Sequence, residues 1–360
     1  MIKTNREKLL QALALVRSLA KSAASLPVLS CVHLHGEDGR LVLRGTDLDS
    51  EIWIELPAEG EFSAVVSAAR LQSFLAACDG KDAALQVVGG FVEIASGGAR
   101  AQLMWIDPTE FPASPAEEKA NTVEFSTHEL IGALDLAFCA SDDATRYVLN
   151  GLLFEGAGPK RKDGLFVVAT DGRRLAVREF PQKISCKAVI PSSACNAMRA
   201  VLNSKLMDDA AVDLGFSEHR AILAAGCVEF SGKLIEGDFP NWRQVLPEVE
   251  SGIAFQPGRL LAAVERAAAV GADSVAIEFK GDRVRVRGEA ADVGNAEDAF
   301  ELSLGGFAHV VKLGEKFFAD GLRWCNSQDG QIAPGNGMEP LVIFPHHGGK
   351  YVLMPMRTGE

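Results

Sequence analysis

Along this chain, segments with a helical spacing of apolar residues are interspersed with strand-like segments. The same order of segments occurs three times. Within residues 6–21, Leu9, Leu13, Val16 and Ala20 fall at the spacing of one helix face. Strand-like runs follow, then a second helical segment and more strand-like runs. The pattern predicts an α+β protein with similar domains, each carrying two helices.

The predicted domains are residues 1–120, 121–249 and 250–360, with linkers near residues 113–121 and 247–252. The helices are predicted at residues 6–21, 68–78, 127–139, 191–202, 257–270 and 314–324. Predicted strands in the first third are 28–34, 41–44, 51–56, 61–66, 84–88, 91–95 and 100–106. Those in the last third are 275–279, 283–287, 341–344 and 351–354.

A turn-like signature supports a duplication. Residues 39–52 and 164–177 both contain an apolar strand, a Thr-Asp pair at a bend and a second strand, and Thr46 and Thr170 lie 124 positions apart. Two Phe-Pro pairs, at Phe111 and Phe239, lie 128 positions apart. Repeats at this distance indicate duplicated domains, because solenoid repeats are far shorter.

Composition narrows the class of protein. The 360 residues are 48% hydrophobic, which is ample for proper cores, and no apolar run is long enough to span a membrane. The seven cysteines are scattered and form no Cys-x-x-Cys pair, and no signal peptide is evident, so we expect a reduced, cytoplasmic protein. The net charge of −12 argues against adhesion to DNA over the whole surface but allows a local basic face.

The sequence lacks the motifs that are typical of several classes of enzyme. It has no Gly-rich phosphate loop, no His-Glu-x-x-His motif and no cluster of cysteine ligands. The pair His346-His347 reads as an exposed loop rather than a metal site. Asp171, Arg173 and Arg174 could imitate a catalytic cluster, but Asp-Gly is typical of a turn with arginines on the next strand. We therefore predict a protein that is not an enzyme and needs no metal or cofactor.

Four separated segments, in order along the chain, carry a resemblance to a known family. They are residues 144–155, 168–176, 237–247 and 351–357, and residues 26–29 and 45–48 fit as well. The chain resembles the bacterial β sliding clamp of DNA polymerase III over its whole length. The resemblance implies a three-domain protomer that forms a head-to-tail homodimeric ring. Helices would line the hole, sheets would lie outside, and double-stranded DNA would pass through without sequence readout.

The resemblance also implies a pocket for short linear peptides with Gln and Leu/Phe anchors. The partners it implies are the replicative polymerase subunit, the clamp loader, translesion polymerases, ligase and mismatch-repair proteins, with no membrane partner. Apolar and methionine side chains would form an adaptable cup for such anchors, and arginines could reach peptide carbonyls. The matching residues are Leu149, Thr170, Gly172, Arg173, Arg174, Leu175, Pro240, Val245, Val352, Met354, Pro355, Met356 and Arg357.

Helical phase and the family pattern together select residues that would face DNA or the second protomer. Arg259 and Arg266 are seven positions apart and share a helix face, as do Lys316 and Arg323. At the joint between protomers the family pattern places Leu103, Ala269 and Val270. The full DNA-facing set is Lys8, Lys21, Tyr147, Arg199, Arg259, Arg266, Lys316 and Arg323.

The sequence departs from the family pattern at two places near the pocket, and two alternatives stay open. Gln244 stands where an arginine is frequent, and residues 358–360 extend the tail with an acidic end. One alternative is a clamp of a mobile element, or a secondary copy, with a narrower set of partners. The other is a hydrolase that uses Asp171 and the arginines beside it.

Overall fold

The computed structural model describes residues 1–20, 26–115, 119–156, 164–207, 211–303, 308–325, 329–335 and 338–356. The chain divides into two compact units. Unit 1 comprises Met1–Asp135, Gly156–Asp163 and Gln182–Glu236, and unit 2 comprises Leu136–Glu155, Gly164–Pro181 and Gly237–Glu360. Each unit combines antiparallel sheets with packed helices, so the predicted α+β class is confirmed.

Unit 1 is built on one continuous antiparallel sheet. Among the described residues its strands follow the order β1-β6-β7-β8-β5-β2-β3-β4-β16-β15-β14-β9. The strands of unit 1 are β1 (Ile2–Asn5), β2 (Cys31–Glu37), β3 (Arg40–Thr46), β4 (Ser50–Gly60), β5 (Phe62–Ser67), β6 (Asp82–Val88), β7 (Phe91–Ser96), β8 (Ala99–Ile106), β9 (Asn121–Phe125), β13 (Lys187–Pro191), β14 (Val212–Phe216), β15 (Arg220–Ala225) and β16 (Val228–Lys233).

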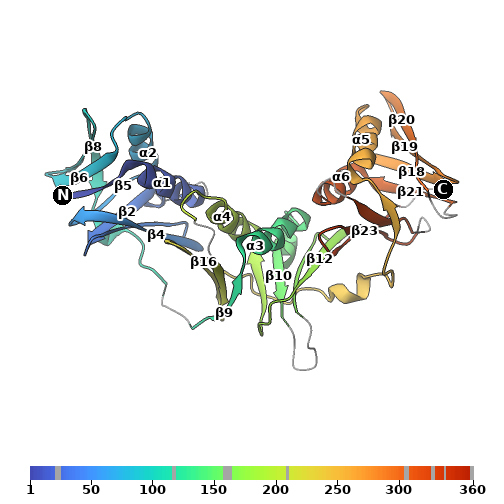
Figure 1. The fold of residues 1–360 in the computed structure, drawn as a ribbon, viewed down its shortest axis with the longest axis horizontal. Coiled ribbons are helices and arrows are strands. Elements are labelled where there is room, and N and C mark those ends of the chain that lie inside the picture. The colour runs from blue at the N-terminus through green and yellow to red at the C-terminus, as the bar shows by residue number, and fades with distance from the viewer. Residues whose placement is uncertain are drawn as a thin grey trace. The chain divides into compact units, whose positions relative to one another are not determined.

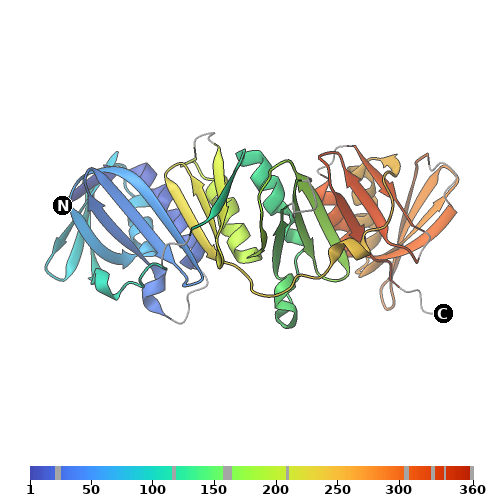
Figure 2. The same cartoon turned by 90° about the horizontal axis from the view of Figure 1, so that it is seen from below.

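The helices of unit 1 pack their apolar stripes against this sheet. Figure 1 shows α1 and α2 on the same face of strands β2–β5, and Figure 2, seen from below, shows these strands in front of α1. Leu9, Leu13 and Val16 are buried, which confirms the helix face predicted from their spacing. The helices are α1 (Arg6–Ala20), α2 (Ala68–Ala76), α3 (Thr127–Leu134) and α4 (Ser192–Leu202), with 3-10 turns at Pro27–Ser30 and Pro108–Glu110.

Unit 2 contains two antiparallel sheets and two α-helices, α5 (Pro257–Ala268) and α6 (Glu315–Trp324), among its described residues. One sheet includes the order β10-β11-β12-β24-β23-β22-β17, and the other has the order β20-β19-β18-β21. The strands are β10 (Gly151–Glu155), β11 (Leu165–Thr170), β12 (Arg174–Phe180), β17 (Ile253–Phe255), β18 (Ser274–Lys280), β19 (Arg283–Ala290), β20 (Gly294–Glu301), β21 (Ala308–Gly314), β22 (Gly330–Ala333), β23 (Leu341–Pro345) and β24 (Lys350–Leu353). The 3-10 turns are Asp135–Cys139, which begins at the last residue of unit 1, Ala144–Leu149 and Trp242–Val245.

The duplicated turn predicted from the sequence is present in both units. In unit 1 the Thr46 hydroxyl donates to the Ser50 carbonyl and accepts from the Leu48 amide. In unit 2 the Thr170 hydroxyl donates to the Arg174 carbonyl and accepts from the Gly172 amide. The third residue of each turn has a positive φ, +79° at Leu48 and +85° at Gly172. Leu48 adopts a conformation that glycine adopts without strain, because the surrounding bonds fix the turn.

One predicted strand starts later than the sequence suggested, and one predicted helix ends earlier. Residues 27–30 form a 3-10 turn, and strand β2 starts only at Cys31. Pro27 has no N–H to donate to a strand ladder, which favours the turn. Residues 135–139 tighten into a 3-10 helix after α3, as helix ends commonly do. Strands β20 and β21 were missed because their residues lack a clean alternation of apolar and polar positions.

Strand pairs join segments that the sequence assigned to different domains. Strand β4 pairs with β16, and β12 pairs with β24, so a sheet continues across each predicted linker. The segments on either side of each linker thus share a sheet, and for that reason the compact units and the predicted domains differ in their limits. No helix formed by the described residues is long and apolar enough to cross a membrane.

Candidate functional site

The turn at residues 170–174 is the centre of the candidate site in unit 2, and its own side chains hold its shape. Oδ1 of Asp171 accepts hydrogen bonds from the amides of Arg173 (2.9 Å) and Arg174 (3.1 Å). The Thr170 hydroxyl donates to the Arg174 carbonyl at 2.6 Å. These Asx and Ser/Thr bonds depend on residues within five positions of one another, so the sequence alone specifies the turn.

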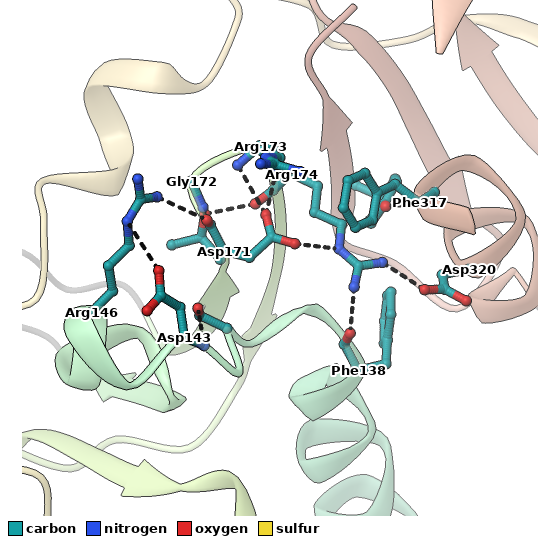
Figure 3. Close-up of polar contacts among 12 residues, drawn as sticks. Phe138, Asp143, Arg146, Asp171, Gly172, Arg173, Arg174, Phe317 and Asp320 are labelled. Carbon is teal, nitrogen blue, oxygen red and sulfur yellow. Dashed lines mark hydrogen bonds and ion pairs between the residues drawn. The ribbon is translucent and has the colours of Figure 1, made fainter. Parts of the chain in front are cut away.

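Arg174 connects this turn to two other segments of unit 2 (Figure 3). Only 7% of the residue is exposed. Its guanidinium group donates to Oδ2 of Asp171 (2.9 Å), to Oδ2 of Asp320 on α6 (2.7 Å) and to the carbonyl of Phe138 (2.9 Å). The guanidinium plane also lies over the ring of Phe317, 4.6 Å from its centroid. A buried cation is tolerated here because carboxylates and a carbonyl take up its donors.

Aromatic and thiol groups beside Arg174 stay neutral. Burial raises the pKa of Tyr351 well above its ordinary value, and its hydroxyl donates to the Phe317 carbonyl at 2.6 Å. Burial likewise raises the pKa of the Cys139 thiol, so this cysteine remains protonated. Burial raises the pKa of Cys325 to about 12. Buried and protonated thiols are poor nucleophiles.

The C-terminal tail lies directly beside the turn, as the resemblance implied. Strand β24 pairs with β12 so that Val352 faces Leu175, and the Met354 amide continues the ladder by donating to the Arg173 carbonyl at 3.0 Å. Val352 and Leu175 are buried, whereas Met354 is 48% exposed and Met356 is 45% exposed. The tail therefore presents two flexible apolar side chains above a packed floor.

The segment at residues 240–245 is anchored to the same unit by its aromatic residue. Nε1 of Trp242 donates to Oε2 of Glu155 at 3.1 Å, and its ring lies 5.5 Å from that of Phe166 on β11. Pro240 is exposed, and 55% of Val245 is exposed. The segment therefore adds the exposed apolar side chains of Pro240 and Val245 to the surface of unit 2.

The loop at residues 144–149 adjoins both the turn and the start of the 237–245 segment. Nη1 of Arg146 donates to the Asp171 carbonyl at 3.4 Å (Figure 3). A Cβ on Gly237 would lie 2.9 Å from the Val148 side chain, so only glycine fits this approach. Leu149 is buried under the loop. The described residues of the predicted pocket thus belong to one unit, and this loop contacts both the turn and Gly237.

The site differs from the sequence prediction in the role of its arginines. The arginines were expected to reach peptide carbonyls, but each guanidinium nitrogen of Arg174 donates inside the protein, so this side chain holds the turn instead. Arg173 is exposed and lies over the edge of Phe317, 6.0 Å from the ring centroid, so it remains able to meet a ligand. Arg357 lies outside the described residues. Phe138, Phe317 and Asp320 were not foreseen, and no local pattern marks them.

The geometry of the site provides for binding and not for catalysis. Both carboxylate oxygens of Asp171 are engaged, one by backbone amides and one by Arg174. Among the described residues no group of His, Cys, Asp and Glu is arranged to hold a metal ion. His347 is not loosely exposed as expected, because its Nε2 contacts the Trp324 carbonyl at 2.8 Å. What the site offers is exposed apolar surface with Arg146 and Arg173 at its rim.

Comparison with known proteins identifies the family. The family model described as the N-terminal domain of the DNA polymerase III beta subunit matches residues 1–115, and the model of its central domain matches residues 125–241. The beta sliding clamp of Caulobacter vibrioides is 29% identical over 372 aligned residues, which cover 98% of each chain. That of Synechococcus elongatus is 27% identical over 364 residues, with 96% of each chain covered.

The chain belongs to the DNA polymerase III β sliding clamp family. Solved clamp structures share its fold from end to end. The sliding clamp of Caulobacter crescentus gives a TM-score of 0.89 at 25% identity, with 99% of both chains covered. The β subunit of Pseudomonas aeruginosa gives 0.89 at 22%, with 99% of this chain and 100% of that chain covered. The protein is thus a DNA sliding clamp that serves polymerase III processivity, and it is not an enzyme.

The basic residues predicted to face DNA in this clamp are largely paired with acidic side chains. Arg259 and Arg266 both donate to Asp298 on β20, the former at 3.0 Å, which confirms that they share a helix face. Hydrogen bonds from these two arginines lower the pKa of Asp298 to about 2, so the carboxylate is ionised at neutral pH. Arg323 contacts Glu265 at 2.9 Å and Asp320 at 3.4 Å.

The remaining predicted DNA-facing residues differ in whether an acidic side chain contacts them. Arg199 contacts Asp135 at 2.7 Å within unit 1. Lys8 and Lys316 are exposed, and no ion pair involves either of them within the described part of the chain. Tyr147 is exposed on the 144–149 loop, and Lys21 lies outside the described residues.

The predicted joint residues lie on β8 and at the end of α5. Leu103 is half-buried on β8, a strand whose residues 99–104 have β7 as their described partner on one side. Ala269 is the C-cap of α5 and is exposed, and Val270 is half-buried just after it. In unit 2, β20 is one of the two edge strands of its sheet among the described residues.

Proposed function

We propose that this sliding clamp closes into a head-to-tail homodimeric ring around double-stranded DNA and recruits its partners at the surface formed by the turn, the tail and residues 240–245. The observation that carries the proposal is the pairing of the tail onto the 170–174 turn, which leaves Met354 and Met356 exposed beside it. We propose that its three domains are residues 1–120, 121–249 and 250–360. A ring held on DNA places the protein with the chromosome, in the nucleoid.

The edge strand β20 and the stretch of β8 at residues 99–104, which pairs only with β7 among the described strands, support the ring. An edge strand presents unpaired N–H and C=O groups that can pair with a strand of another chain. Strand β20 carries Glu301 and β8 carries Arg100, so the two strands bring charges of opposite sign to the joint. Pairing β8 of one protomer with β20 of the other uses two different surfaces, and it gives a closed ring when the rotation closes.

Retention on DNA tests the ring function directly. The clamp, once loaded, should stay on circular DNA and slide from the same DNA after linearisation, because a ring holds DNA by topology and not by affinity. The solution mass should be twice the 38.4 kDa of the chain. Equal retention on circular and linear DNA would show that the protein binds DNA by contact alone.

The joint residues provide the second prediction. Leu103→Asp combined with Val270→Asp should give folded monomers, because two buried carboxylates at an apolar contact cost more free energy than a marginal joint can supply. Sedimentation measures the mass, and circular dichroism reports the fold. Leu48→Asp, the same type of change at an exposed turn, should leave the dimer intact. A dimer that survives both joint substitutions would place the interface elsewhere.

The ion pairs of α5 give the third prediction, on DNA association. Asp298→Asn should strengthen direct association with DNA about two- to tenfold at low salt, because it frees Arg259 and Arg266 for phosphate groups. The steepness of the salt dependence should increase by about 0.9 for each additional phosphate that the freed arginines neutralise. Glu289→Gln removes an exposed acidic charge from the neighbouring strand β19 and serves as the control.

Lys316 extends the same test to a cation without an acidic partner. Lys316→Ala should weaken association in the wild-type protein more than Arg259→Ala does, since the charge of Arg259 is already offset by Asp298. An unchanged salt series for Asp298→Asn and Lys316→Ala would show that this face does not meet DNA.

Short linear peptides with Gln and Leu/Phe anchors are the proposed ligands of the exposed surface. We propose that they belong to the replicative polymerase subunit, the clamp loader, translesion polymerases, ligase and mismatch-repair proteins. Met354, Met356 and Val245 supply apolar contacts that can adapt to different anchors, and Arg173 supplies hydrogen-bond donors. If the chain is a secondary copy with fewer partners, it should fail to bind the clamp loader of its own cell.

A further inference from the structure

A small hollow in unit 1 lies beside the first copy of the duplicated turn. Its volume is about 130 Å³, and it is bounded by the end of α1, the turn at residues 46–50 and the start of α4. The buried residues Leu19, Ser50 and Ala197 form its floor, and the side chains of Ser18, Asp47 and Asn196 line its rim. It is separate from the proposed peptide surface, which belongs entirely to unit 2.

The duplication shows what fills the corresponding space in unit 2. Ser50 occupies the last position of its turn, and Arg174 occupies the same position in the second copy. Ser18 lies twelve residues after the first residue of α1, and Cys139 lies twelve after the first residue of α3. Ala197 lies five residues into α4, and Asp320 lies five into α6. The hollow therefore matches the space that the Arg174 side chain fills.

The carboxylate of Asp47 in the hollow corresponds to the carboxylate of Asp171, which binds the Arg174 guanidinium in unit 2. Oδ1 of Asp47 accepts from the amides of Asp49 (3.2 Å) and Ser50 (2.6 Å), as Oδ1 of Asp171 does in its own turn. In unit 2, Oδ2 of Asp171 also accepts from Arg174. Among the hydrogen bonds and ion pairs of the described residues, none involves Oδ2 of Asp47. Asn196 on the rim can offer a second, neutral acceptor.

Charge and size favour an arginine over other occupants. The Asp47 carboxylate disfavours a phosphate or a carboxylate, and the polar rim disfavours a purely apolar side chain. The volume equals the share of about four water molecules, at ~30 Å³ each, and a guanidinium group has four heavy atoms. The arginines of unit 1 near this point are engaged elsewhere, since Arg17 donates to Gln72 and Arg220 donates to Ser231.

We propose that this hollow is a second docking site, which receives an arginine side chain of a protein partner in the position that Arg174 takes in unit 2. The guanidinium group donates to Oδ2 of Asp47 and to the Asn196 side chain, over the floor of Ser50 and Ala197. The site acts independently of the tail, so a partner could use it alone or together with the peptide surface.

A blocked tripeptide tests the site on the full-length protein. Trifluoroacetyl-Gly-Arg-Gly-amide, followed by the line width of its fluorine resonance, should bind saturably with a dissociation constant of about 1 mM, as expected of a single anchored side chain. The matched peptide with citrulline, which has the same shape but no charge, should bind at least about tenfold more weakly.

Variants locate the binding. Asp47→Asn keeps the acceptor for the turn amides but removes the charge, and it should weaken the arginine peptide at least about tenfold. Ser50→Arg should abolish binding by filling the hollow from within, and Glu37→Gln, an exposed change on β2, should have no effect. Absence of saturable binding, equal binding of the citrulline peptide, or undiminished binding by Asp47→Asn would each overturn the proposal. Persistence of binding in a folded Ser50→Arg protein would do the same.

Discussion

A clamp that ends at Leu353 is expected to lose its affinity for a peptide with Gln and Leu/Phe anchors. The deletion leaves β24 and its pairing with β12 intact but removes the exposed side chains of Met354 and Met356. Each anchor contributes roughly 1.5–3 kcal/mol when it is fully desolvated. The costs of association leave a single short peptide in the micromolar range, so loss of one anchor contact is enough to abolish measurable binding.

Fluorescence polarisation with a labelled peptide measures this loss, and sedimentation checks that the mass of the dimer is unchanged. A milder variant, Met354→Ser with Met356→Ser, keeps the backbone bonds of the tail to the carbonyls of Arg173 and Lys312 and should reduce affinity almost as much. Removing only residues 358–360 serves as the second control and should preserve or increase affinity, because it takes away an acidic end. Undiminished affinity in the longer deletion would mean that partners dock at another surface.

Arg174→Ala is expected to lower the free energy of opening of β12 and α6 by about 3–5 kcal/mol, the range seen when one member of a buried ion pair is removed. The substitution leaves the carboxylates of Asp171 and Asp320 and the carbonyl of Phe138 without the donor they share. It also empties the space against Phe317. Since the turn is held by the same carboxylate, peptide binding should weaken as well.

Hydrogen exchange of the amides in β12 and α6 measures this opening free energy without assuming that the whole chain unfolds in one step. Arg173→Ala, one position earlier and exposed, is the matched control and should change the opening free energy by less than about 0.5 kcal/mol. Arg174→Lys retains the charge but cannot reach three acceptors at once, so it should fall between these limits. A loss below about 1 kcal/mol for Arg174→Ala would contradict the bridging role of this side chain.

The candidate site could be predicted in part because some of its structure is local. The turn at residues 170–174 is closed by bonds among Thr170, Asp171 and Arg174, and the same bonds close the turn at Thr46. The placement of the tail beside it came from the resemblance to the clamp family, and no local pattern in residues 351–356 indicates a partner strand. The strand pairing of β24 with β12 confirms that placement.

The sequence by itself determined the helix faces, the duplicated turn and the α+β class, because each depends on periodicity or on hydrogen bonds between residues only a few positions apart. Tertiary structure decided which partners the charged side chains contact. Arg174 contacts Asp320, 146 positions away, and Arg259 and Arg266 on α5 share Asp298 on β20. Such contacts arise when a sheet and a helix bring distant residues together, and no spacing along one segment records them. For that reason the sequence assigned Arg174 to peptides and Arg259 and Arg266 to DNA, whereas in the folded protein carboxylates contact all of them.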